Sequence, residues 1–88
     1  MRIDKFLVLA QLIKHRKEAQ SACEAGKIIL NERIAKSSKE VRPGDKIIVH
    51  YSGRVIGIQV LGIPEDHAIK KDEARLLYRV LFEDKMER

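Results

Sequence analysis

The sequence is poor in the residues that build covalent cross-links, metal cages and enzyme centres. Cys23 is the single cysteine in 88 residues, which excludes an internal disulfide and a cysteine-based zinc cage. The histidines His15, His50 and His67 lie in separate segments without metal-ligand spacing. No Ser/His/Asp order indicates an activated nucleophile. We therefore expect no cofactor, no metal and no catalytic residue, and we interpret Cys23 as a small buried residue on a helix.

Long apolar runs are also missing. No segment approaches the roughly 20 apolar residues that span a bilayer, and residues 6–13 are flanked by charge without a small-residue cleavage site behind them. The sequence thus predicts a cytoplasmic protein without a membrane partner. A chain this short has room for one thin core. We expect a monomeric single domain over residues 1–88, with a core over residues 1–63 and a C-terminal helix and tail over residues 64–88.

Two short helices are predicted at the N-terminal end. In residues 3–13, Phe6, Leu9 and Ile13 recur at helical spacing. Asp4 would lie in the first turn, where a carboxylate suits the positive end of the helix dipole. After a very short connection, residues 17–25 form a second helix with a narrow face of small residues. The two helices are therefore expected to pack closely, and the glycine at position 26 is expected to end the second one.

Short strands are predicted for the middle of the chain. Residues 27–31 form a strand, residues 31–33 a tight turn, and residues 34–35 a brief return. The sequence Pro43-Gly44-Asp45 indicates another turn. It precedes a hairpin of residues 46–51 and 54–63 around Ser52-Gly53.

The C-terminal segment has an apparent helical pattern. From Asp72 onward, Ala74, Leu77, Tyr78 and Leu81 recur at helical spacing, and the charged residues 83–88 are expected to fray. The predicted fold class is therefore α+β, with two N-terminal helices packed on a small, mostly antiparallel sheet and a short C-terminal helix.

The excess positive charge is confined to one part of the chain. The 18 Lys and Arg exceed the 13 Asp and Glu by five. Residues 2–39 hold nine basic and four acidic residues, so the whole excess lies there. The basic residues of this segment are Arg2, Lys5, Lys14, Arg16, Lys17, Lys27, Arg33, Lys36 and Lys39, with His15 among them.

The densest basic cluster, Lys14-His15-Arg16-Lys17, lies at the predicted junction of the two helices. A junction places consecutive side chains on a corner of the domain, where arginine forks and lysine charges can reach successive phosphates. Such a run is also common in a solvated loop, and Arg2 could simply pair with Asp4 or Glu24. Placement and charge together favour an RNA-binding protein.

Several sequence blocks resemble one known family, the alpha-L RNA-binding motif of ribosomal small-subunit protein four. The blocks cover about half of the chain with their spacing intact. They are Met1-Arg2-Ile3-Asp4-Lys5-Phe6-Leu7, Leu12-Ile13-Lys14-His15-Arg16 with Ala19, Ala25-Gly26-Lys27-Ile28, Asn31, Ala35-Lys36-Ser37, and Val41-Arg42-Pro43-Gly44-Asp45-Lys46-Ile47. Among stand-alone members, the length and the tail Lys70-Lys71-Asp72-Glu73-Ala74 with Tyr78 look most like the RqcP family of ribosome-associated quality control, which is related to the heat-shock protein fifteen family.

This resemblance implies a function and its partners. It implies binding to the large ribosomal subunit, through ribosomal RNA and a stalled peptidyl-tRNA. It also implies work beside an RqcH-type tailing factor that extends the nascent chain with alanine.

The resemblance also implies roles for single residues. Arg2 and Arg16 match RNA-contacting arginines of the family, and Asp4 matches an acidic position that acts as a structural orienter. Together with the residues chosen by charge, the predicted RNA-binding set is Arg2, Lys5, Lys14, His15, Arg16, Lys17, Lys27, Arg33, Lys36 and Ser37.

Two positions depart from the family pattern. Lys17 stands where Ser or Thr could cap the second helix, which predicts a looser helix start or another acceptor. Glu32 stands where the family usually has glycine, which leaves the turn type open and adds a negative charge near the predicted RNA face.

Three alternatives stay open at this point. The protein could be a heat-shock-type factor that recycles large subunits, or an RNA-binding accessory of an RNA-modification enzyme. It could also be a protein-interaction module that uses the sheet and the C-terminal helix.

Overall fold

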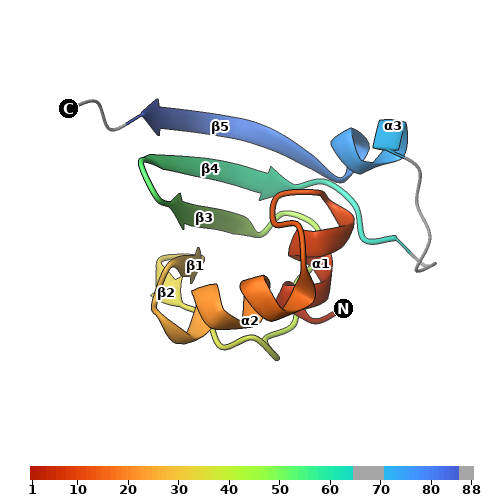
Figure 1. Ribbon diagram of the computed structural model, residues 1–88. Helices are drawn as coiled ribbons and strands as arrows, with labels where there is room; N and C mark the ends of the chain where they lie inside the picture. Colours follow the sequence, from red (N-terminus) through yellow and green to blue (C-terminus); the bar gives the residue numbers. More distant parts are fainter. Residues whose placement is uncertain (65–70, 86–88) are drawn as a thin grey trace.

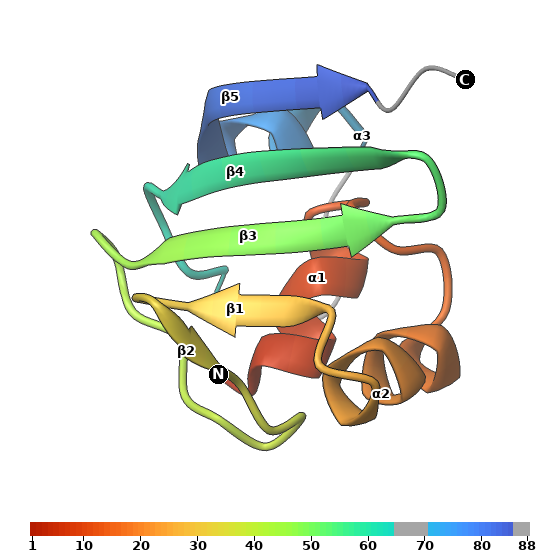
Figure 2. The ribbon, with the colours of Figure 1, turned by 90° about the vertical axis from the view of Figure 1, so that its left-hand side faces the viewer.

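The computed structural model describes residues 1–64 and 71–85. Its centre is a five-stranded antiparallel sheet in the order β2-β1-β3-β4-β5. Helices α1 and α2 lie on one side of this sheet (Figure 1), and Figure 2 looks at the other face, with α1 behind the strands. The elements are α1 Ile3–Leu9, α2 Arg16–Glu24, β1 Ile28–Leu30, β2 Arg33–Ile34, β3 Lys46–Tyr51, β4 Arg54–Val60, α3 Lys71–Ala74, the 3₁₀ helix η1 Arg75–Leu77 and β5 Tyr78–Lys85.

Helix α1 is shorter than the sequence pattern suggested. It ends at Leu9, so the predicted extension to residue 13 is wrong. Gln11 adopts a left-handed backbone with φ of 60° and turns the chain. The amides of Leu12 and Ile13 then both donate to the carbonyl of Leu7, at 2.9 and 3.1 Å. Leu12 and Ile13 still reach the core, although through a turn and not through the helix.

Helix α2 begins one residue earlier than predicted, at Arg16. His15 occupies the N-cap position without a side-chain capping bond, and Lys17 lies inside the first turn. Position 17 is therefore not the N-cap position of α2, which corrects the prediction that a residue there could cap the helix. The small-residue face packs as expected, because Ala19 and Cys23 are buried. Burial raises the pKa of the Cys23 thiol, as do the nearby charges of Asp4 and Glu24.

The β1–β2 hairpin contains a turn that glycine would fit better. Asn31 and Glu32 both have positive φ, of 48° and 73°. Two consecutive positive φ values are characteristic of a type I′ turn, which favours Asn-Gly. Asn31 suits its position, whereas Glu32 carries a side chain in a region that side chains rarely occupy.

Strands β3 and β4 form the predicted hairpin and supply the floor of the core. Its register pairs Ile47 with Ile58 and Val49 with Ile56 across the two strands. These side chains face α1 and are buried in one cluster with Phe6. Strand β4 ends at Val60, three residues before the predicted end.

The predicted C-terminal helix is short, and its extension past Leu77 is wrong. Residues 71–77 are helical, but Tyr78–Lys85 form β5, which pairs with β4. The predicted fraying of residues 83–85 is likewise wrong, because they lie in β5; residues 86–88 lie outside the described part. A bulge explains the missed strand: Gly57 pairs with Phe82 and Ile58 with Val80, so Leu81 is an extra residue that breaks the two-residue alternation.

A row of apolar side chains crosses the sheet on the face away from the helices. Register neighbours in this row are Ile34, Ile29, Ile48, Gly57 and Phe82, one from each strand. A Cβ atom on Gly57 would lie 2.1 Å from the Phe82 ring, so the ring covers the glycine directly. Phe82 is 42% exposed on its outer side.

Candidate nucleic-acid interface

A buried carboxylate connects the two N-terminal helices. Asp4, in the first turn of α1, is fully buried. Its Oδ1 accepts hydrogen bonds from the Lys5 amide at 2.8 Å and Arg2 Nε at 3.2 Å. Its Oδ2 accepts from Arg2 Nη2 at 3.2 Å, Gln20 Nε2 at 3.1 Å and Arg16 Nε at 3.4 Å. One side chain thus accepts hydrogen bonds from the start of α1 and from α2, and so connects the two helices.

The hydrogen bonds keep Asp4 ionised. Burial by itself would raise the pKa of this carboxyl group. Bonds from Gln20, Arg2 and the Lys5 amide, together with the charge of Arg16, outweigh burial and hold the pKa below its ordinary value. At neutral pH the buried charge is therefore negative and is matched by two arginines.

Both arginines remain available to a ligand. The side chains of Arg2 and Arg16 are 45% and 48% exposed, although Asp4 beneath them is not exposed at all. A guanidinium group has five N–H donors. Arg2 donates two of its five N–H groups to Asp4, and Arg16 donates one. Asp4 therefore orients each guanidinium group and leaves other donors of that group for a ligand.

The loop after β2 adds further basic side chains beside this pair. The Ile3 amide donates to the Lys39 carbonyl at 2.7 Å, and the Asp4 amide donates to the Ser37 carbonyl at 3.3 Å. The first turn of α1 is thereby fixed against residues 37–39. Arg33, Lys36 and Lys39 line a hollow of about 460 Å³ formed by β2 and this loop.

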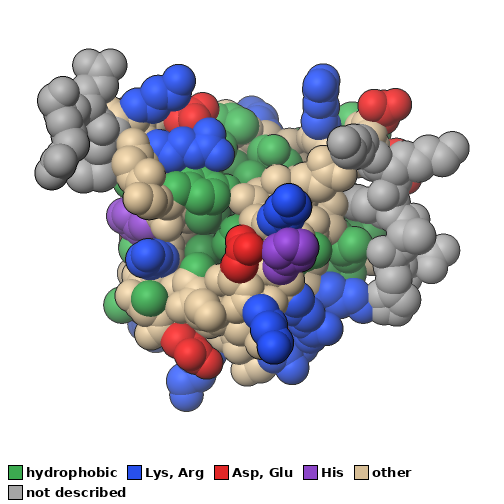
Figure 3. Space-filling model, viewed as in Figure 1, with side chains coloured by type: hydrophobic (Ala, Val, Ile, Leu, Met, Phe, Trp, Pro, Cys, Tyr) green, Lys and Arg blue, Asp and Glu red, His purple; other side chains and the backbone are tan. Residues whose placement is uncertain are grey.

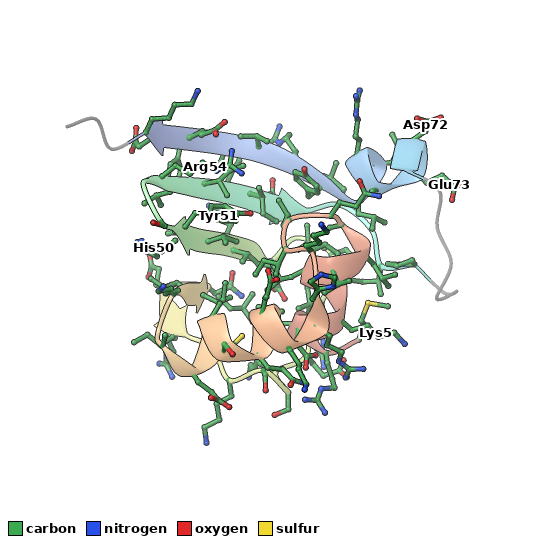
Figure 4. The ribbon with its side chains drawn as sticks, viewed as in Figure 1. Lys5, His50, Tyr51, Arg54, Asp72 and Glu73 are labelled. Atoms are coloured by element: carbon green, nitrogen blue, oxygen red, sulfur yellow. The ribbon has the colours of Figure 1, made fainter. Side chains whose placement is uncertain are left out.

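The other predicted residues lie outside the Asp4 centre, which consists of Asp4 with Arg2, Arg16 and Gln20. Lys5 is half-buried on α1 and lies well away from His50, Tyr51 and Arg54 at the turn between β3 and β4 (Figure 4). Lys14 and His15 are exposed in the turn before α2, and Lys17 is exposed on its first turn. With Lys27, Lys14 and Lys17 line a second hollow, between α2 and the end of β3.

Sequence reasoning missed two members of this surface. Gln20 holds Asp4, and its only signal was its spacing of four residues from Arg16 on the same helix, which places both on one face. Lys39 was counted in the charge excess but not assigned to the site, and it lines the hollow with Arg33 and Lys36.

Residues 1–64 and 71–85 contain neither a metal-binding cluster nor a membrane-spanning helix. In these residues no group of three His, Cys, Asp or Glu side chains could hold a metal ion. No helix there is long and apolar enough to cross a membrane. His67 and Lys70 lie outside the described residues.

Comparison with known proteins identifies the family. Two relatives called "RQC P-site tRNA stabilizing factor" match almost end to end. The one from Bacillus subtilis is 37% identical, over 98% of this chain and 98% of its own. The one from Halalkalibacterium halodurans is 34% identical, over 96% of this chain and 93% of its own. A family model described as the S4 domain matches residues 1–47.

The chain belongs to the S4 domain family.

The S4 domain match runs from α1 through the α2 helix and the basic loop into β3. It therefore contains the Asp4 centre and both arginines. A trimeric structure of heat shock protein 15 from Vibrio cholerae agrees with the full architecture. It has a TM-score of 0.83 and 32% identity, over 91% of this chain and 80% of that one. The predicted resemblance to the protein-four-type domain and the α+β fold are thus confirmed.

Proposed function

We propose that this protein is a non-enzymatic RNA-binding factor of ribosome-associated quality control. It binds ribosomal RNA and peptidyl-tRNA on obstructed large subunits in the cytoplasm, as a monomer. In doing so it supports alanine tailing of stalled chains by an RqcH-type factor. The names of the relatives from Bacillus subtilis and Halalkalibacterium halodurans support the P-site tRNA and the quality-control pathway.

The observation that carries this proposal is the shared hold of Asp4 on Arg2 and Arg16. A buried carboxylate that orients two half-exposed arginines presents fixed forks, and such forks match phosphate oxygens. Because their direction is set before binding, little side-chain freedom is lost when an RNA docks. The lysines on either side add charge along the path of a phosphate backbone.

Arg16→Ala tests this assignment. We expect the variant to lose co-sedimentation with large subunits that carry peptidyl-tRNA. A charge-assisted hydrogen bond contributes about 1.5–3 kcal/mol, which corresponds to a loss of roughly tenfold to a hundredfold in affinity. Arg75→Ala is the matched control, because it removes the same charge from an exposed position in η1, outside residues 1–47. Unchanged co-sedimentation of Arg16→Ala at physiological salt would contradict the proposal.

Salt dependence gives a second measurement on the same complex. Neutralised phosphates release counterions, so the affinity of the wild-type protein should fall steeply as salt is raised. Arg16→Ala should show a shallower slope than the wild type, and Arg75→Ala should not. A flat wild-type response would exclude phosphate contacts.

A second candidate is a heat-shock-type factor that recycles large subunits. The likeness to heat shock protein 15, with a TM-score of 0.83, favours it. A reconstituted tailing reaction with an RqcH-type factor separates the two candidates. Loss of alanine addition when this protein is left out supports quality control, whereas unchanged alanine addition supports the recycling factor.

A further inference from the structure

A groove next to the Asp4 centre has an apolar floor. It has a volume of about 550 Å³ and lies between one face of α2 and the end of β3. Buried Leu12, Ile13 and Val49 and half-buried Ala22 form part of its lining. In Figure 3, hydrophobic side chains are visible in this hollow between α2 and the strands, with charged side chains around them.

The charge around this groove is predominantly positive. Three lysines line it: Lys14 in the turn before α2, Lys17 in the first turn of α2, and Lys27 directly before β1. His50 also lines it, and among the residues that the structure describes Glu18 is the one acidic lining residue. The groove therefore suits an anionic ligand that also has an apolar part.

The far wall of the groove is held in place. Tyr51, at the end of β3, donates its hydroxyl hydrogen to the Leu12 carbonyl, which ties β3 to the turn after α1. The Arg54 guanidinium lies 4.5 Å from the centre of the Tyr51 ring. Figure 4 shows His50, Tyr51 and Arg54 together at this end, far from Asp72 and Glu73 on α3. A wall fixed in this way keeps the groove open without a ligand.

We propose that this groove binds one unpaired nucleotide of the RNA. The base lies on the apolar floor, and the flanking phosphates meet Lys14, Lys17 and Lys27. This inference rests on the proposed function. It adds a subsite for a single-stranded or bulged nucleotide to the surface around Arg2 and Arg16, whose proposed contacts are with phosphates. Sequence-specific RNA recognition mostly targets unpaired bases in loops, bulges and single strands, because these bases can be splayed out into a protein site.

Size and polarity fit a nucleotide. Small-molecule sites are typically about 300–1,000 Å³ and combine an apolar lining with a few polar groups. Ser21 and Ser52, together with His50, supply hydrogen-bonding groups at the edge of this groove. A base needs such edge contacts for its exocyclic atoms, and its faces need the apolar floor.

The position of the groove explains how one RNA reaches both sites. Arg16 turns toward Asp4, and its chain neighbour Lys17 lines the groove. Lys14, two residues before Arg16, lines the groove as well. The oriented arginine and two lysines of the groove thus come from one short segment, residues 14–17, and we expect one RNA strand to contact both.

Site-specific crosslinking identifies the occupant. Ser21→p-benzoylphenylalanine places a photoreactive group at the groove, and Gln59→p-benzoylphenylalanine places one on the opposite face of the sheet. With large subunits that carry peptidyl-tRNA, we expect the Ser21 probe to crosslink to a single unpaired nucleotide of ribosomal RNA or tRNA. Crosslinks to a protein, to paired nucleotides only, or to no RNA at all would overturn the proposal.

Filling the groove tests its contribution to affinity. Ala25→Leu adds bulk at the C-cap position of α2, which is exposed and lines the groove, without changing the charge. We expect five- to tenfold weaker binding, about 1–1.4 kcal/mol, with an unchanged salt slope because no phosphate contact is lost. Gln59→Leu, a neutral change of similar kind on the other sheet face, should bind like the wild type.

The results separate this inference from the function on which it rests. If the wild-type protein co-sediments and Ala25→Leu binds equally well, the nucleotide subsite is wrong and the proposed function stands. If the wild-type protein itself fails to bind large subunits, both are wrong. A lower salt slope for Ala25→Leu would also count against the subsite, because it would mean that phosphate contacts were disturbed.

Discussion

The two ends of the molecule use charged residues in opposite ways. Around α1 and α2, the charge of Asp4 is buried and shared among several donors. Between β4 and β5, the ion pair of Arg54 and Glu83 lies at the surface, 3.0 Å apart. Surface pairs contribute about 0–1 kcal/mol, whereas removing one partner from a buried charge network costs several times more.

This difference separates the part that we propose binds RNA from the part that supports it. The helical end needs a polar group in the interior, because that group sets the direction of the arginines. The sheet end depends on apolar fit, as the contact between Gly57 and Phe82 shows. Single changes at each end should therefore have different consequences for stability and for RNA binding.

Asp4→Asn should have the largest effect, and it should lower both the stability of the protein and its RNA binding. An asparagine loses the charge and one acceptor oxygen while Arg2, Gln20 and the Lys5 amide remain. We expect a loss of about 2–4 kcal/mol in the free energy of unfolding and much weaker co-sedimentation. Chemical denaturation and sedimentation measure the two effects, and stability equal to that of the wild type would contradict the role of Asp4.

The stability difference between the wild type and Asp4→Asn should depend on pH, and the pKa of Asp4 sets the direction of this dependence. The pKa of Asp4 is lower in the folded state than its ordinary value. Its contribution is therefore fully present above the unfolded pKa of about 3.9 and is lost as pH falls through the folded pKa. The stability difference between the wild type and Asp4→Asn should be constant near neutral pH and shrink in strong acid. A difference that grew with acidity would contradict this sign.

Gly57→Ala should have an intermediate effect, confined to the sheet end. The added methyl group would lie 2.1 Å from the Phe82 ring, so the ring must move out. We expect a loss of about 1–2 kcal/mol with unchanged co-sedimentation, because no residue of the α1–α2 end is involved. Gly62→Ala is the matched control, since nothing lies within 4 Å of its added Cβ.

A double variant sharpens this result. If the clash with the ring is the cause, Gly57→Ala should cost much less in a Phe82→Ala background than in the wild type. Equal costs in both backgrounds would mean that the glycine is required for some other reason. Loss of RNA binding by Gly57→Ala would contradict the conclusion that the sheet end affects stability without affecting RNA binding.

Glu32→Gly should have the smallest effect, and it should stabilise the protein. Glu32 holds a φ of 73° in the β1–β2 turn, where a side chain costs about 1 kcal/mol relative to glycine. Removing its negative charge beside Arg33 should also strengthen RNA binding slightly. A thermal melt with a raised midpoint is the expected result. A lowered midpoint would show that the glutamate side chain makes a contact that offsets its backbone strain.

Much of the helical end could be predicted from local sequence. The spacing of Phe6 and Leu9 predicted α1, and the small residues Ala19 and Cys23 predicted the close face of α2. Asp4 could be assigned as an orienter by family resemblance, and its buried bonds to Arg2 and Arg16 agree with that role. Gln20 could not be assigned, because its bond to Asp4 exists only after the two helices have packed.

Errors arose where a backbone irregularity hid the local period. Gln11 turns the chain in a left-handed conformation that is usual for glycine and rare for glutamine. Nothing in the sequence therefore marked the end of α1, and the helix was predicted to be longer than it is. At the other end, the extra Leu81 in the β5 bulge disrupted the alternation between Val80 and Phe82. The apolar residues Ala74, Leu77, Tyr78 and Leu81 then recur at the spacing that is typical of a helix. Pairing with β4 decided the conformation, and that pairing cannot be read from the segment alone.

The position at which the S4 domain match stops has a consequence for modular design. The match ends at residue 47, in the second residue of β3, yet Val49, Ile58 and Val60 complete the core beneath α1. A graft of residues 1–47 onto another protein would carry the arginines and Asp4 but would leave the apolar underside of α1 open to water. A transplantable unit has to extend at least to Val60. The proposed arginine surface can be exchanged between proteins only together with the β3–β4 hairpin that completes the core beneath it.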